Sequence, residues 1–270
     1  MDGVPARVLD LFAATGPPEP LEGGRGLSVR VGDLVLSPGG DERVAIWLCP
    51  VQARLAVRLD ERRGRRSPGR SLRLALPVPA RDGSWVVDGW AATRFEPDAT
   101  PCTDLGVLRA TGHLLHAELA VAVPRRPGAL DGRDDRWARA DHLVWSSGAR
   151  VPAVGAVGAL AGRLLALREP LDLPSQLVHG DLAGNVLLDA SGVPFVLDLA
   201  PYWRPPGWAD AVTVLDAVLW QRADPDALAG LGRTGRQLVL RAVLFRLLSD
   251  EVPAPTRYAA AARTAGLLES

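Results

Sequence analysis

The sequence predicts an α+β protein with two lobes, a small β-rich N-terminal lobe over residues 1–95 and a larger, mostly helical C-terminal lobe over residues 96–270. Three observations support this prediction. Short apolar runs separated by glycines dominate the first lobe. Apolar residues recur at helical spacing over long stretches of the second. A polar motif between Leu177 and Leu199 interrupts the second lobe and carries the candidate chemistry.

The N-terminal lobe is expected to consist mainly of strands and turns. A short helix over residues 4–13 precedes them, and Gly32-Asp33 has the composition of a hairpin turn. Residues 41–59 have helical spacing, although Pro50 is expected to kink or end that helix. The expected strands are residues 21–31 (two strands joined by a glycine-rich turn), 34–37, 74–78, 85–87 and the extended segment 89–95.

The C-terminal lobe is expected to contain four long helices. They cover residues 105–121, 154–167, 208–220 and 235–248. Residues 124–150 are rich in arginine and aspartate, and their spacing does not settle their structure.

Composition limits the function classes. The 270 residues have zero net charge, from 31 basic and 31 acidic side chains, which argues against a nucleic-acid partner. No apolar run approaches the roughly 20 residues of a membrane span, and no secretory signal is expected, so the cytoplasm is the expected compartment. Cys49 and Cys102 make neither a disulfide framework nor a zinc site. The oligomeric state stays open.

The motif begins with His179-Gly180-Asp181 at the end of an apolar strand. A tight turn there presents the Asp181 carboxylate to a bound substrate, as a general base requires. A lone His-Gly-Asp is more often an ordinary turn. Here an alternating strand, a turn and a returning strand with Asp198 follow Asn185. Such a hairpin brings Asn185 and Asp198 to neighbouring strand ends, where amide and carboxylate oxygens suit Mg²⁺.

With these residues the sequence resembles the aminoglycoside phosphotransferase and choline kinase group of the protein-kinase-like fold, and looks most similar to an actinobacterial branch. The resemblance implies an ATP- and Mg²⁺-dependent phosphotransferase, a small-molecule kinase whose acceptor is a hydroxyl. It makes Asp181 the catalytic base and Asn185 and Asp198 the metal ligands. His179 would brace the loop. Asp216, with Asp210 as the alternative, would hydrogen-bond the catalytic loop.

The same resemblance assigns the nucleotide site to the N-terminal lobe. The turn glycines would cover the phosphates, and backbone groups of residues 92–95 would contact adenine. The residues implied are Gly23, Gly24 and Gly26 for the phosphates and Ala92 and Arg94 for adenine.

The sequence departs from the family pattern in two places. Three residues instead of four separate Asp181 from Asn185. The chain also contains no lysine, and Ser37 occupies the position expected for the lysine that grips the phosphates. Arg30 or Arg25 is the candidate substitute, because a guanidinium binds phosphate well.

Two readings of the function therefore stay open besides a coincidental motif on another fold. The first is a working kinase for an unidentified hydroxyl acceptor. The second is a catalytically impaired, pseudokinase-like module that binds nucleotide or another protein. The proline-rich loop over residues 201–206 lines an acceptor pocket in the first reading and is plain packing otherwise.

Overall fold

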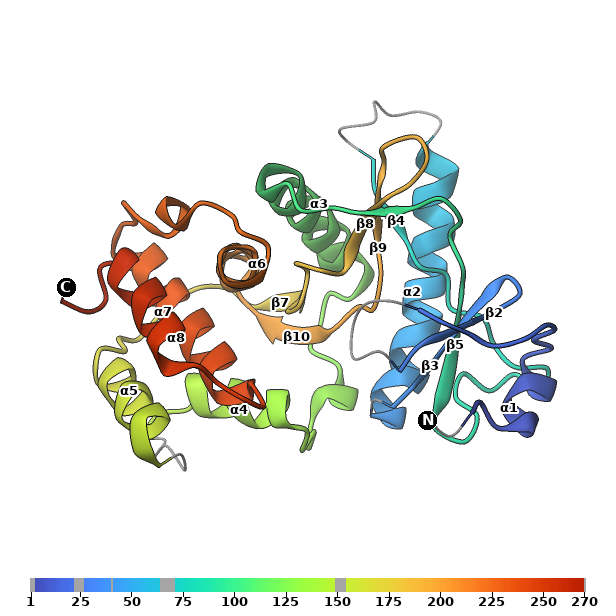
Figure 1. Ribbon diagram of the computed structural model, residues 1–270, viewed down its shortest axis with the longest axis horizontal. Coiled ribbons are helices and arrows are strands. Elements are labelled where there is room, and N and C mark those ends of the chain that lie inside the picture. The colour runs from blue at the N-terminus through green and yellow to red at the C-terminus, as the bar shows by residue number, and fades with distance from the viewer. Residues whose placement is uncertain (1–2, 22–26, 40, 64–70, 149–153, 270) are drawn as a thin grey trace. The chain divides into compact units, whose positions relative to one another are not determined.

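Figure 1 shows the computed structural model of the protein, which describes residues 3–21, 27–39, 41–63, 71–148 and 154–269. Contacts divide the chain into two compact units. The first unit is Met1–Cys102, Pro127–Ala129 and Gly184–Leu199, and the second is Thr103–Arg126, Leu130–Ala183 and Ala200–Ser270. This division differs from the expected boundary at residue 95. The hairpin with the proposed metal ligands belongs to the first unit instead of the helical one.

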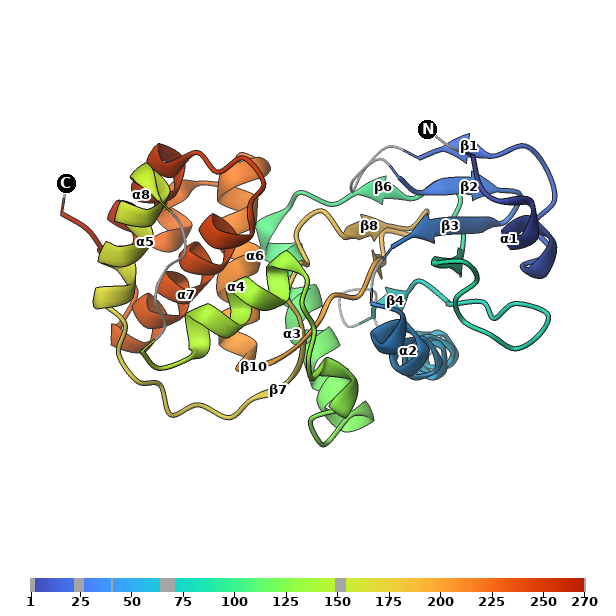
Figure 2. The same cartoon turned by 90° about the horizontal axis from the view of Figure 1, so that it is seen from below.

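The first unit contains an antiparallel sheet in the order β1-β2-β3-β5, and Figure 2 shows β1, β2 and β3 side by side. Its strands are β1 Glu19–Pro20, β2 Val29–Val31, β3 Leu34–Pro38 and β5 Trp90–Arg94. Gly32 makes the β2–β3 turn at φ +61°, where a Cβ would lie 2.9 Å from the Thr15 carbonyl oxygen. Helix α1 (Ala6–Leu11) buries Val8 in a core shared with Leu36. The expected hairpin and short helix are thus confirmed.

Helix α2 (Glu42–Arg63) follows β3. The Asp41 carboxylate accepts hydrogen bonds from the backbone N–H groups of Arg43 (2.9 Å) and Val44 (3.4 Å), which cap the helix. The helix continues through Pro50, so the expectation of a helix end there is wrong. A proline inside a helix costs about 3 kcal/mol. Burial of Leu48 and Leu55 on either side of Pro50 offsets that cost.

A second four-stranded sheet in the first unit has the order β4-β9-β8-β6. Its strands are β4 Arg73–Leu74, β6 Thr100–Pro101, β8 Val186–Leu188 and β9 Pro194–Val196. Strands β8 and β9 form the expected hairpin, β9 pairs parallel with β4, and β8 pairs antiparallel with β6. Because these ladders join residues far apart in sequence, the hairpin becomes part of the first unit.

Two expected strands are shorter than the apolar pattern indicates. Of residues 74–78, only Leu74 belongs to a named strand. Residues 85–87 make a single bridge, Val87 to Trp90. The Asp82 carboxylate accepts a hydrogen bond from the Ser84 backbone N–H at 2.9 Å, and this local bond favours a turn over a strand.

The second unit contains six of the α-helices in the described part of the chain. They are α3 Leu105–Ala122, α4 Arg136–Trp145, α5 Gly155–Ala166, α6 Pro206–Trp220, α7 Arg233–Ser249 and α8 Pro255–Thr264. Helix α4 settles part of the ambiguous segment, and α8 is additional to the expected helices. Helix α7 contacts α4, α5, α6 and α8, so it is buried almost all round (Figure 2). No helix in the described residues is long and apolar enough to cross a membrane.

A two-stranded antiparallel sheet leads into the motif. Strand β7 (Gln176–His179) pairs with β10 (Pro201–Arg204), with Pro201 opposite His179. Residues 201–204 were expected to be a loop. They form a strand because their backbone groups pair with those of β7. The local composition of residues 201–204 gives no sign of this distant partner.

Candidate active site

The Asp181 loop is held by His179, the last residue of β7. The His179 ring nitrogen Nδ1 accepts a hydrogen bond from the Asp181 backbone N–H at 3.2 Å. It also lies 3.4 Å from the backbone nitrogen of Ala200, which donates to it. A nitrogen that accepts these bonds carries no proton, so the ring braces the loop, as the sequence predicts.

His116 on α3 binds the backbone of the same loop at His179. Its ring nitrogen Nε2 accepts a hydrogen bond from the His179 backbone N–H at 3.1 Å. Burial lowers the pKa of His116 to about 3, with the nearby His179 acting in the same direction. The imidazole is therefore neutral at pH 7 and acts as a hydrogen-bond acceptor for the loop.

Gly180 separates His179 from Asp181 and lies against an aromatic ring. A Cβ at this position would be 2.4 Å from Cδ2 of Tyr202 on β10. Tyr202 is buried and packs edge-on against Trp208 and Phe245, at centroid distances of 5.4 and 5.6 Å. The ring cannot move aside, so glycine is required here to bring the loop close to β10.

Asp181 is paired with a buried arginine from α7. Arg246 donates from Nη2 to Oδ1 of Asp181 at 2.5 Å and from Nε to Oδ1 of Asp216 at 2.8 Å. The Asp181 side chain is 44% exposed, whereas that of Asp216 is 3% exposed. Sequence reasoning missed Arg246. Its only signal is one arginine inside the apolar run from Val243 to Leu248.

Of the two acids proposed to hold the catalytic loop, Asp216 reaches it through Arg246. Burial raises the pKa of the Asp216 carboxyl to about 7, against the opposing effect of the Arg246 charge. Arg246 also lies 3.4 Å from the Gly180 carbonyl oxygen, to which it donates. Asp210 instead binds Arg109 through two hydrogen bonds of 2.9 and 2.8 Å near the surface.

Asn185 and Asp198 lie at the open end of the β8–β9 hairpin. The backbone N–H of Leu197 donates to the Asn185 carbonyl oxygen at 2.8 Å, which extends the ladder by one residue. Asp198 follows Leu197 at φ +30°, a backbone region that non-glycine residues rarely adopt. The structure thus brings these two residues to neighbouring strand ends, as the sequence predicts. Such backbone strain is frequent at functional sites.

The donor set of this hairpin end suits Mg²⁺. One carboxylate and one amide oxygen are hard ligands, and Mg²⁺ in phosphotransferases takes its other ligands from phosphates and water. No group of three or more His, Cys, Asp or Glu side chains able to hold a metal occurs among the described residues.

The far end of the same hairpin is anchored by charges. Arg73 on β4 donates to Glu96 at 2.5 Å and to Oδ2 of Asp189 at 3.3 Å. The other Asp189 oxygen accepts hydrogen bonds from the backbone N–H groups of Ser191 (2.9 Å) and Val193 (3.0 Å). Burial alone would raise the pKa of Asp189, but hydrogen bonds from the Ser191 hydroxyl, the two backbone N–H groups and Arg73 lower it to about 2. The Asp189 side chain is therefore a charged carboxylate at neutral pH and accepts these hydrogen bonds within the turn.

The residues proposed to bind nucleotide are only partly described. Gly23, Gly24, Gly26 and Arg25 lie outside the described residues. Arg30 lies on β2, where Nε donates to the Gly32 carbonyl oxygen at 2.9 Å and the guanidinium lies 4.2 Å from the Phe95 ring centre. Its role toward phosphate stays a prediction.

Ala92 and Arg94 lie on β5, the last strand of the first sheet, and their backbones also bond to residues 76–78. The Ala92 carbonyl oxygen accepts from the Val78 backbone N–H, and the Arg94 backbone N–H donates to the Leu76 carbonyl oxygen, both at 2.9 Å. Arg94 also forms a surface ion pair with Asp33. These two backbone groups are already used within the protein, so an adenine contact through them would have to break a sheet hydrogen bond.

Ser37 lies on β3 at the position expected for lysine. Its hydroxyl is 2.8 Å from the hydroxyl of Ser28, across from it on the neighbouring chain segment. The two serines form a neutral pair where a kinase usually has a positive charge. The Ser37 hydroxyl is neutral and cannot supply that charge. A positive charge that replaces the lysine must therefore come from another position.

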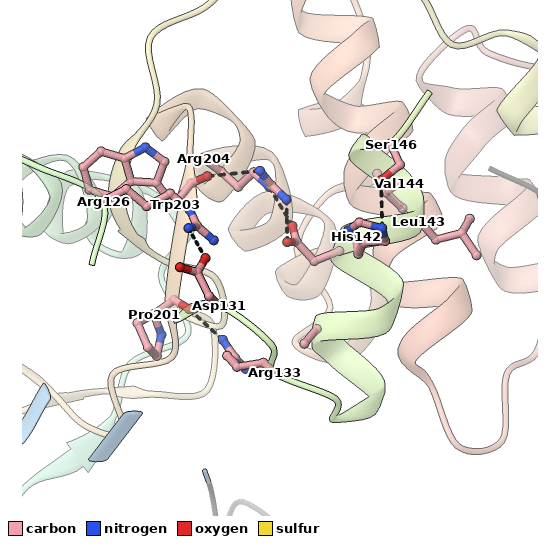
Figure 3. Close-up of polar contacts among 12 residues, drawn as sticks. Arg126, Asp131, Arg133, His142, Leu143, Val144, Ser146, Pro201, Trp203 and Arg204 are labelled. Atoms are coloured by element: carbon pink, nitrogen blue, oxygen red, sulfur yellow. Dashed lines mark hydrogen bonds and ion pairs between the residues drawn. The ribbon is translucent and has the colours of Figure 1, made fainter. Parts of the chain in front are cut away.

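A cavity of about 820 Å³ opens in the second unit between α4, the segment before it, and β10. Figure 3 shows polar contacts among several of the residues that line it. The floor of the cavity includes Tyr202, Pro201 and Leu130. Pro201 lies opposite His179 in the β7–β10 ladder, so the cavity lies beside the strand that ends in the Asp181 loop. This volume is in the range of small-molecule sites.

Charges lining the cavity are balanced. Arg204 donates two hydrogen bonds to Asp141, at 2.8 and 2.6 Å, and Arg133 donates to the Pro201 carbonyl oxygen at 2.9 Å (Figure 3). The lining arginines each have a carboxylate partner. These pairs are Arg126 with Asp131, Arg133 with Asp135, Arg139 with Asp134, and Arg204 with Asp141. Fixed donors and acceptors therefore face the cavity without a large excess of either charge.

Comparison with known proteins supports the fold. No family model matches the sequence, and no curated protein matches it. Among solved structures, the aminoglycoside phosphotransferase of Alicyclobacillus acidocaldarius is 14% identical, with a TM-score of 0.56 over 98% of this chain and 94% of that protein. The chain has the protein-kinase-like fold of these phosphotransferases.

Two further structures share this kinase-like fold. A choline/ethanolamine kinase family protein from Mesorhizobium loti is 19% identical, with a TM-score of 0.51 over 95% of this chain and 89% of that one. Amicoumacin kinase hAmiN, solved with AMP-PNP, Ca²⁺ and amicoumacin, is 14% identical, with a TM-score of 0.51 over 96% and 90%. The predicted resemblance and two-lobed α+β class are confirmed, and placement in the actinobacterial branch stays a prediction.

Proposed function

We propose that this chain is an ATP- and Mg²⁺-dependent phosphotransferase that phosphorylates a hydroxyl group of a small molecule. The observation that carries the proposal is the Asp181 loop. Two hydrogen-bonded histidines and Arg246 hold a half-exposed carboxylate at the end of β7. Such a carboxylate orients an acceptor hydroxyl and accepts its proton during phosphoryl transfer.

In the proposed reaction the hydroxyl oxygen forms a bond to the γ-phosphorus, and the bond between that phosphorus and the β–γ bridging oxygen breaks. ADP leaves with the electron pair of that bond, and the hydroxyl proton passes to Asp181 and then to solvent. Asn185 and Asp198 would hold Mg²⁺ through oxygen atoms. The bound ion would neutralise charge on the phosphate oxygens.

The balanced cavity supports a particular acceptor class. Each lining arginine is paired with a carboxylate, so a strongly cationic or anionic acceptor meets little net attraction there. Rigid side-chain pairs such as Arg204 and Asp141 instead present adjacent donors and acceptors, which match vicinal hydroxyls. We therefore propose an uncharged or zwitterionic acceptor with several hydroxyl groups.

The alternative is a nucleotide-binding module without turnover. The neutral Ser37–Ser28 pair favours this alternative, because it replaces the charge that usually grips the phosphates. Both readings require a nucleotide site, but only the kinase also produces ADP and a phosphorylated acceptor.

The test is calorimetric titration of the purified protein with ATP, with and without Mg²⁺, for the wild type and Asp198→Ala. The proposal expects Mg²⁺-dependent binding that the variant loses. Asp88→Ala is the matched control, because Asp88 is a surface acid of the same unit that also has a positive φ of 48°.

³¹P NMR with ATP and a panel of sugars, polyols and amines then separates the two readings. No nucleotide binding in any condition contradicts both and favours the remaining alternative, a module that binds another protein.

A further inference from the structure

Arg246 is a charged residue in the interior of the second unit. It lies on α7 between Phe245 and Leu247, which are both buried, and its side chain is 8% exposed. A buried guanidinium is strongly unfavourable unless carboxylates and hydrogen-bond acceptors surround it. Burial alone would lower the pKa of Arg246, but the carboxylates of Asp216 and Asp181 raise it. The side chain is therefore cationic at any pH at which the protein is folded.

The geometry around Arg246 is asymmetric. Asp216, on α6, is buried and binds both Nε and Nη2 of the guanidinium, which fixes the plane of the group. Nη2 then reaches Oδ1 of Asp181 at 2.5 Å and the Gly180 carbonyl oxygen at 3.4 Å. The buried Arg246–Asp216 pair, which joins α7 and α6, thus holds the Nη2 group of Arg246 in place to donate to the half-exposed Asp181.

We propose that Arg246 is the positioning residue of Asp181. Anchored by Asp216, its rigid fork fixes the side-chain orientation of the carboxylate that receives the acceptor hydroxyl. This inference rests on the proposed phosphotransfer, and it adds a residue outside the His-Gly-Asp motif to the site. Asp181 follows a glycine in a tight turn, so without Arg246 its side-chain torsions lose a fixed partner. Misplacement of a reacting group by about 1 Å costs roughly 10²-fold in rate.

Lysine could not perform this role equally well. Its ammonium is a point charge on a flexible stem, whereas the arginine fork binds Asp216 with two nitrogens and still directs one hydrogen bond to Asp181. Arg246→Lys preserves the charge and loses this geometry. It therefore separates positioning of Asp181 from simple neutralisation of the two carboxylates.

Arg241, on the same helix, is a matched control. It is also buried, but it donates to the Gln237 and Glu169 carbonyl oxygens at 3.0 and 2.6 Å and to the Gln237 side chain at 2.8 Å. Among the residues that the structure describes, no carboxylate forms an ion pair with Arg241. Replacing it removes a buried arginine from α7 without touching the Asp181 loop.

The experiment compares kcat, the KM for ATP and the free energy of unfolding across several variants. Arg246→Gln alone leaves Asp216 buried without its cation, so it is combined with Asp216→Asn, which removes that charge and preserves folding. The double variant is expected to unfold cooperatively, keep its KM for ATP within about threefold and lose about 10- to 100-fold in kcat. Arg246→Lys is expected to fall between the double variant and the wild type.

Controls decide whether the loss is specific. Arg241→Gln is expected to be less stable than the wild type, with kcat changed less than about twofold at a temperature where it is folded. Asp216→Asn alone retains the Arg246–Asp181 bond and is expected to keep more activity than the double variant. An unchanged kcat in the folded double variant, or an equal loss in Arg241→Gln, overturns the proposal.

A second measurement does not depend on phosphotransfer. In the Asp216→Asn background, the unfolding equilibrium constant is measured for Asp181→Asn, Arg246→Gln and both together. If Arg246 holds Asp181, the second substitution changes this constant less once the first is present. Additive effects overturn the inference whatever the activity. Coupled effects in a protein that transfers no phosphoryl group support the Arg246–Asp181 contact and reject the proposed function instead.

Discussion

His116 accepts a hydrogen bond from the backbone of His179, so a neutral imidazole from α3 supports the strand end that carries the Asp181 loop. The contact is buried, and protonation of His116 would replace the acceptor by a second donor. Protonation of His116 would therefore affect both the stability of the fold and the position of the Asp181 loop.

The hydrogen bond between His116 and His179 predicts that the folded protein loses stability in acid. The pKa of His116 is about 3 in the folded protein and near 6.5 in the unfolded chain. The unfolded state therefore binds more protons as the pH falls below 6.5, and stability is lost progressively down to about pH 3. At pH 5 the contribution of His116 is a loss of about 2 kcal/mol relative to pH 7.

Urea unfolding at pH 7 and pH 5 measures this loss. His116→Gln keeps an acceptor for the His179 backbone and removes the titration, so its stability is expected to change less between the two pH values. His113→Gln, on the exposed side of the same helix, is the control. Equal pH slopes for the wild type and His116→Gln contradict the prediction.

Gly180 is predicted to tolerate no side chain. In Gly180→Ala the new Cβ would lie 2.4 and 2.6 Å from the Tyr202 ring, which cannot move within its aromatic cluster. We expect a loss of about 1–3 kcal/mol in the free energy of unfolding, typical of overpacking. Gly162→Ala, in open space on α5, is the control and is expected to be neutral or stabilising. Thermal and urea unfolding measure the stability of both variants, and equal stability of Gly180→Ala and the wild type contradicts the prediction.

Asp181→Asn tests the base. The amide keeps the size of the side chain but cannot accept the hydroxyl proton, so kcat is expected to fall by at least about 100-fold. Unfolding stability should fall only modestly, because Asp216 still pairs with Arg246 in this variant. Asp172→Asn, an exposed acid nine residues earlier, is the control. Turnover retained by Asp181→Asn removes Asp181 from the catalytic role.

Arg30→Ala tests the substitute for the missing lysine. If the Arg30 guanidinium binds phosphate, the Kd for ATP is expected to rise about tenfold, the effect of losing one charge-assisted hydrogen bond. Arg43→Ala removes an exposed arginine from the start of α2 and should leave the Kd unchanged. Calorimetry measures both. Identical affinity for the wild type and Arg30→Ala assigns the role to another residue.

Asp141→Asn tests the cavity as the acceptor site. The amide loses the ion pair with Arg204 and leaves that guanidinium with excess positive charge in the cavity. We expect the KM for an acceptor found in the screen to rise about tenfold, with the KM for ATP unchanged. Asp226→Asn, in an exposed turn of the same unit, is the control. A rise in the KM for ATP alone would place the acceptor elsewhere.

Local patterns predicted most of the helices and the central hairpin. The apolar spacing of residues 105–121 and 235–248 corresponds closely to α3 and α7. In α3 this spacing also indicates which face is buried. The segment that spacing left undecided contains α4. There the helix begins at Asp135, whose side chain accepts from the Ala138 backbone N–H at 2.8 Å, and such a cap is a signal independent of hydrophobic spacing.

The sequence by itself determined which residues carry the candidate chemistry: Asp181, Asn185 and Asp198 stand in one short motif, where local turns and a hairpin set their order. It also determined that no lysine is present. Only the tertiary structure decided that Arg246, 65 residues after Asp181, binds it. The strand at β10 and the assignment of the hairpin to the first unit were decided in the same way. Each depends on pairing between segments distant along the chain, and a local pattern carries no information about such partners.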